Sequence, residues 1–90
     1  MKHYLTQSEM DRVEALCRSA LEVPNKAEAQ KYLTQAQYLV SDVFGPSRNI
    51  LASLFAAVSN ASGQVSDKAR KVDVAEQAIL KASTFCVGKD

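Results

Sequence analysis

The chain lacks tryptophan and has few of the residues that usually carry chemistry. Its single histidine, His3, lies in the first residues, so the commonest general base is missing from every segment that we expect to fold. Two cysteines are too few for a disulfide scaffold, and too few for a zinc site without help from histidine. None of the three glycines belongs to a phosphate-binding loop or a dinucleotide-binding motif. We therefore expect no enzyme, no catalytic residue, no metal site and no cofactor.

The chain also lacks a large excess of positive or negative residues. The chain has 11 lysines and arginines against 10 aspartates and glutamates, and a net charge of +1 gives no electrostatic reason to expect nucleic acid or an anionic membrane. The longest apolar-rich stretch, residues 50–58, is far shorter than the ~18 residues that cross a bilayer. Residues 1–7 lack the apolar core of a signal peptide. We expect a cytoplasmic protein without a membrane partner.

The chain is instead rich in alanine, with a hydrophobic content of 47% that is ordinary for a globular protein. Alanine has the highest helix propensity and allows helices to approach closely. A length of 90 residues fits one domain and not two. We expect a single helical domain over residues 1–90.

Capping signals set the bounds of the first two expected helices. Residues 6–9, TQSE, have the pattern of a capping box, in which the threonine and the glutamate each satisfy a free amide at the helix start. Pro24 disfavours helical geometry in the residue before it and ends this helix. Asn25 caps the second helix, which residues 45–46, GP, close. Cys17 lies on the apolar stripe of the first helix, which favours a buried structural cysteine.

Serine and glycine mark the last two helices. Ser47 can cap the third helix, which stops at Gly63. Ser66 is the expected cap of the fourth helix, with Asp67 placed to complement the positive end of its dipole, and Gly88 marks its exit. The expected helices span residues 7–23, 26–44, 47–62 and 67–86.

Four helices joined by short connections favour antiparallel neighbours. The sequence therefore predicts an all-α fold, with a four-helix up-down-up-down bundle as the default arrangement. The alternative is two helical hairpins that complete their core by dimerisation.

The third expected helix carries almost no charge, since Arg48 is the only charged residue from Val43 to Val65. One of its faces is broadly apolar, and the reverse face is uncharged and mostly small, which is typical of a helix enclosed by protein on most sides. Two interpretations stay open: neighbours in the same chain cover the reverse face, or this face docks a second subunit or a target helix. The reverse face comprises Asn49, Ala52, Ser53, Ala56, Ser59 and Asn60.

Two further features exceed the needs of one small bundle. Val74, Ala78 and Phe85 lie well round the fourth helix from its regular apolar stripe, and the size of Phe85 favours a partner contact over scattered surface residues. Basic and acidic residues alternate along the same helix, which is typical of a solvated mixed surface. Tyr38 falls opposite the apolar stripe of the second helix, where it is either a recognition residue or a ring lying along the surface.

These patterns favour a protein-binding module, such as an adapter, an inhibitor or an immunity-type small protein, whose partner is another protein or a second copy in a homodimer. The alternative is a small helical DNA-binding regulator that reads DNA with residues 67–86, although the net charge and the alternating acidic residues disfavour it. The predicted partner-binding residues are Ala52, Ala56, Ser59, Asn60, Val74, Ala78, Phe85 and Tyr38.

Overall fold

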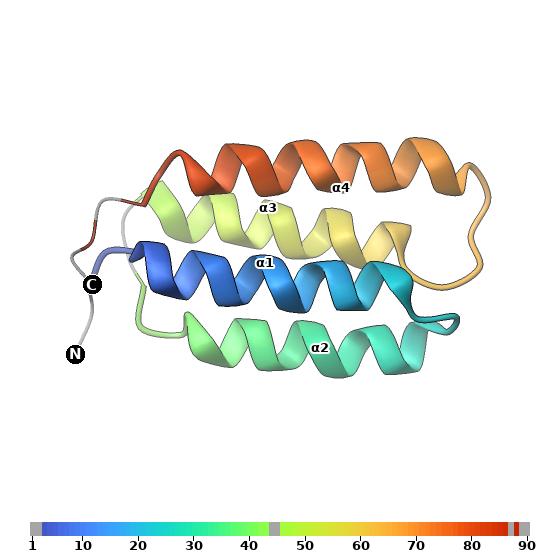
Figure 1. Cartoon of the computed structure of the whole chain (residues 1–90), viewed down its shortest axis with the longest axis horizontal. Helices are drawn as coiled ribbons and strands as arrows, with labels where there is room; N and C mark the ends of the chain where they lie inside the picture. The colour runs from blue at the N-terminus through green and yellow to red at the C-terminus, as the bar shows by residue number, and fades with distance from the viewer. Residues whose placement is uncertain (1–2, 44–45, 87, 89–90) are drawn as a thin grey trace.

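The computed structural model describes residues 3–43, 46–86 and 88, and this part of the chain is all-helical (Figure 1). Its only extended pairing is an isolated parallel bridge between His3 and Val43. None of the described helices combines the length and the apolar character that crossing a bilayer requires. The helices are α1 (Gln7–Glu22), α2 (Lys26–Leu39), α3 (Pro46–Ala61) and α4 (Lys68–Ser83).

The predicted starts of α1 and α2 are confirmed. The Thr6 side chain accepts a hydrogen bond from the Glu9 amide over 3.1 Å, and the Glu9 carboxylate accepts one from the Thr6 amide over 3.0 Å, which completes the capping box. Asn25 Oδ1 accepts a hydrogen bond from the Glu28 amide over 2.8 Å. Each cap satisfies an amide that the first helical turn leaves without an intrahelical acceptor.

The prediction that the second helix reaches residue 44 is wrong, because α2 ends at Leu39. The chain then turns so that Val43 forms the bridge with His3, whose amide donates to the Asp42 carbonyl over 3.0 Å. This pairing joins segments far apart in the sequence, and the local helical pattern of residues 40–43 does not reveal it. Residues 44 and 45, including the predicted glycine stop, lie outside the described residues.

The expected caps of the last two helices also need correction. Ser47 is not an N-cap, because α3 already begins at Pro46, a residue type that suits the first helical position. The N-cap of α4 is Asp67 rather than Ser66; it has a left-handed φ of 54° and makes no side-chain cap hydrogen bond. The same helix ends at Ser83, three residues before the predicted end.

The helices form two hairpins laid against each other, α1 with α2 and α3 with α4 (Figure 1). Consecutive helices run in opposite directions in this view, and the helix contacts are compatible with an up-down-up-down bundle. Within the described residues, α2 and α4 do not touch. The Cα atoms span 38 × 21 × 17 Å, a thickness of about two helix layers at roughly 8–10 Å between axes. Each helix therefore keeps a side open to solvent.

The buried hydrophobic core draws on all four helices and on the segments that flank α1 and α2. The buried Ser62 hydroxyl donates to the Val58 carbonyl over 2.6 Å, so its polar group is satisfied. The largest fully buried apolar side chains are Leu5, Met10, Leu54, Ile79, Val13, Val43 and Val58.

Candidate functional site

The outward face of α3 stays uncovered. Ala52 and Ala56 are exposed, whereas the neighbouring Leu51, Leu54 and Phe55 are buried in the core. α3 contacts all three other helices. None of these neighbours covers the two alanines, which lie one helical turn apart on the same face.

A groove of about 460 Å³ runs between α2 and α3, which we call the α2–α3 groove. Leu33, Leu51 and Phe55 are nearly buried and form its apolar floor. Three predicted residues line its α3 side, namely Ala52, Ala56 and Ser59. Its α2 side could not be predicted from the sequence, because helix periodicity does not tell which helices lie next to each other. The other lining residues are Gln30, Gln37, Val40, Ser41 and Arg48.

A second groove, of about 450 Å³, lies between the end of α3 and the start of α4, and we call it the α3–α4 groove. It brings together Asn60 and Val74, two further predicted residues. Val74 is 55% exposed. The other lining residues are Lys26, Ala57, Val65, Arg70 and Lys71.

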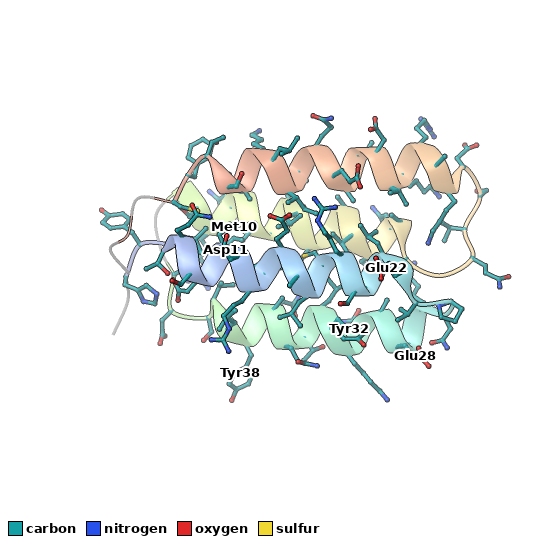
Figure 2. All side chains as sticks on the ribbon, in the orientation of Figure 1. Met10, Asp11, Glu22, Glu28, Tyr32 and Tyr38 are labelled. Atoms are coloured by element: carbon teal, nitrogen blue, oxygen red, sulfur yellow. The ribbon has the colours of Figure 1, made fainter. Side chains whose placement is uncertain are left out.

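The remaining predicted residues do not join either groove. Ala78 is half-buried against the core and lines a smaller hollow beside Ile50. Phe85 is 37% exposed just beyond the end of α4. Tyr38 is 82% exposed, and its side chain points away from the other helices (Figure 2). The eight predicted residues are therefore spread over several surfaces rather than gathered in one site.

Two exposed apolar side chains escaped the sequence analysis, Tyr4 at 46% and Leu80 at 58% exposed. Leu80 lies well round α4 from its core stripe, so its position on the helix could have identified it. Tyr4 precedes the first helix, where no periodicity signals exposure.

The described linings of the two grooves contain no cysteine, histidine or carboxylate. Cys17 is fully buried, and burial, reinforced by the nearby Glu14 carboxylate, raises the pKa of its thiol to about 12. Cys86 is half-buried, and it forms no disulfide with Cys17. Among the described residues, no three histidine, cysteine, aspartate or glutamate side chains are placed to hold a metal ion. The polar groups in the two linings are amides, hydroxyls, lysine ammonium groups and arginine guanidinium groups.

Comparisons with protein-family models, with curated protein sequences and with solved structures find no match to this chain. The geometry of these surfaces is therefore the basis for a functional proposal.

Proposed function

We propose that this chain is a cytoplasmic, non-enzymatic protein-binding module that acts by steric occupancy through the uncharged surface of α3 and the adjoining part of α4. The proposal includes one domain over residues 1–90, built as an up-down-up-down bundle. The observation that carries it is the α2–α3 groove, whose floor is apolar and whose α3 side presents the exposed Ala52 and Ala56.

Small side chains suit this face to a helical partner. Alanines one turn apart allow another helix backbone to approach closely, which increases the number of dispersion contacts along both helices. The α3 side of the groove carries no charge apart from Arg48 at one end, so covering it removes few charged groups from water. Burial of apolar area then contributes about 25 cal/mol per Å².

The first partner that we propose is a second copy of the chain, in a symmetric dimer. An isologous interface uses the same patch on both subunits, and an uncharged patch of small residues meets its own copy without like-charge repulsion.

Size-exclusion chromatography with light scattering tests this proposal. We expect the mass of the wild-type chain to rise from one copy toward two with concentration. Ala56→Arg should hold it at one copy, because a long charged side chain blocks close approach. Ala69→Arg changes an exposed alanine outside both grooves and should still associate. Unchanged association of a folded Ala56→Arg variant would reject this surface.

The DNA-binding alternative finds less support in the charges of α4. Its exposed residues include Asp73 and Glu76 as well as basic side chains. Carboxylates on a reading helix repel the phosphate backbone that supplies most of the affinity for DNA.

A further inference from the structure

We infer that the α3–α4 groove binds an acidic segment of a protein partner, with carboxylates held by Lys26, Arg70 and Lys71 and a neighbouring apolar side chain seated on Val74. This inference rests on the proposed function, and it names the chemistry of the segment that this surface would recognise.

Basic and acidic residues alternate along the sequence of α4, but only basic residues of this helix line the groove. Arg70 and Lys71 line the groove, whereas Glu76 lies 3.4 Å from Arg18 of α1, on another side of the helix. Asp73 is exposed and does not line the groove. The fold therefore concentrates positive charge in one hollow of a chain whose net charge is +1.

The third cation reaches the groove through a contact between segments distant in the sequence. Gly63, in the connection between α3 and α4, packs so closely on the start of α2 that a Cβ atom there would lie 3.1 Å from the Lys26 main-chain nitrogen. This contact brings Lys26 to the same hollow as Arg70 and Lys71.

Of two charged residues at the start of α4, Lys68 adds no cation to the groove and Asp67 does not neutralise it. Lys68 turns its ammonium group to the Ala61 and Gly63 carbonyls and does not line the groove. Asp67 Oδ2 lies 3.4 Å from a guanidinium nitrogen of Arg70, but both side chains are more than two thirds exposed. An exposed pair of this kind contributes about 0–1 kcal/mol, so an incoming carboxylate can compete for the arginine.

The groove also has an apolar part. Ala57 and Val65 are half-buried in its lining, next to the exposed Val74. Its volume falls within the roughly 300–1,000 Å³ typical of ligand sites. Cations beside an apolar surface complement a segment that places glutamates or aspartates next to an aliphatic or aromatic side chain.

A protein segment fits this arrangement better than a nucleic acid. A nucleic acid presents phosphates along an extended track, and proteins neutralise them with basic residues spread along it. Here the cations line one hollow, and Asp73, which is exposed outside it, would repel a polyanion that extends along α4.

Fluorescence anisotropy with synthetic peptides tests the inference. The probe is a labelled peptide with four glutamates around one leucine and one phenylalanine, and the control peptide has glutamine at the four acidic positions. We expect the acidic peptide to bind and the control to bind at least about tenfold more weakly. The affinity should fall as salt rises from about 50 to about 200 mM.

Variants locate the contact. The double variant Arg70→Glu, Lys71→Glu should weaken binding of the acidic peptide at least about tenfold, and Val74→Asn a few-fold. Lys31→Glu, an exposed charge reversal outside the groove, should change it less than about twofold. Circular dichroism checks that each variant is folded.

No binding of the acidic peptide, or equal losses in the Lys31→Glu and groove variants, would overturn the inference. Tighter binding of a DNA oligonucleotide through the same cations would also overturn it. If the acidic peptide does not bind, while Ala56→Arg abolishes self-association, the proposed function would remain intact. If the acidic peptide binds but Ala56→Arg does not change self-association, the result would support peptide binding in the α3–α4 groove and reject the α2–α3 groove as the self-association surface.

Discussion

Ser47, in the first turn of α3, donates a hydrogen bond from Oγ to the main-chain oxygen of Phe85, 3.0 Å away and just beyond the end of α4. The serine is 3% exposed, and the contact lies at the open end of the α3–α4 hairpin, away from the connection between the two helices. It fixes the main chain at the point where the Phe85 ring is left 37% exposed. This hydrogen bond therefore fixes the position at which the aromatic ring is exposed.

Replacing Ser47 tests the contribution of this hydrogen bond to stability. Ser47→Ala removes the donor and leaves the Phe85 carbonyl without it, which should lower the free energy of unfolding by about 1 kcal/mol. Urea denaturation measures the change. Ser53→Ala, an exposed serine of the same helix, is the matched control and should be close to neutral. Equal effects of the two substitutions would show that the hydrogen bond contributes nothing.

A substitution of Gly63 tests the contact between the α3–α4 connection and the start of α2. Its φ of +76° is left-handed, and a Cβ atom would lie 3.1 Å from the Lys26 main-chain nitrogen. Gly63→Ala should therefore lower the free energy of unfolding by about 1–2 kcal/mol. Gln64→Ala, at the exposed next position, should have little effect. An unchanged stability in Gly63→Ala would mean that the loop adopts another conformation.

The capping box makes stability depend on acid pH. Burial raises the pKa of Glu9, but hydrogen bonds from the Thr6 amide, His3 and the Thr6 hydroxyl outweigh it and leave the pKa below its usual value near 4.5. A lowered pKa means that the carboxylate stabilises the fold above the unfolded-state pKa, and that this contribution disappears as pH falls through the folded-state pKa.

Glu9→Gln should therefore destabilise the protein most near neutral pH, and its difference from wild type should shrink as pH falls below about 4.5. Unfolding free energies of both proteins, measured from pH 7 to pH 3, provide the comparison. A difference that stays constant across this range would contradict the account of the Glu9 carboxylate.

The two thiols should react differently. Cys17 is fully buried with a pKa raised to about 12, whereas Cys86 is half-buried near the end of the chain. Alkylation with iodoacetamide near pH 8 should add one group to the native protein and two groups in denaturant. Mass spectrometry counts the adducts, and Cys86→Ser should take up none in the native state. Rapid double alkylation of the native wild type would show that the core around Cys17 opens readily.

The parts of the fold that depend on local chemistry could be predicted from the sequence. Thr6 and Asn25 cap their helices as expected, because a cap needs residues only a few positions apart. The end of α2 could not be predicted, because Val43 leaves the helix to pair with His3. The hydrogen bond from Ser47 to Phe85 could not be predicted either, because it joins segments that are distant in the sequence.

The candidate surfaces show the same division. The uncharged side of α3 was visible in the spacing of Ala52 and Ala56, since helical periodicity places them on one face. The choice of α2 as the other side of this groove depends on how the hairpins pack, and so does the arrival of Lys26 beside Arg70. Both require the tertiary structure.

Disulfide cross-linking tests most directly whether the exposed side of α3 meets a second copy. Ala52→Cys and Ala56→Cys, each in a Cys86→Ser background, would be oxidised alone and as an equimolar mixture. The account predicts a covalent dimer in at least one of these samples, because a symmetric contact brings paired Cα atoms within about 7 Å. Ala69→Cys, outside both grooves, should form no covalent dimer. No more dimer in any α3 sample than in Ala69→Cys would contradict the account.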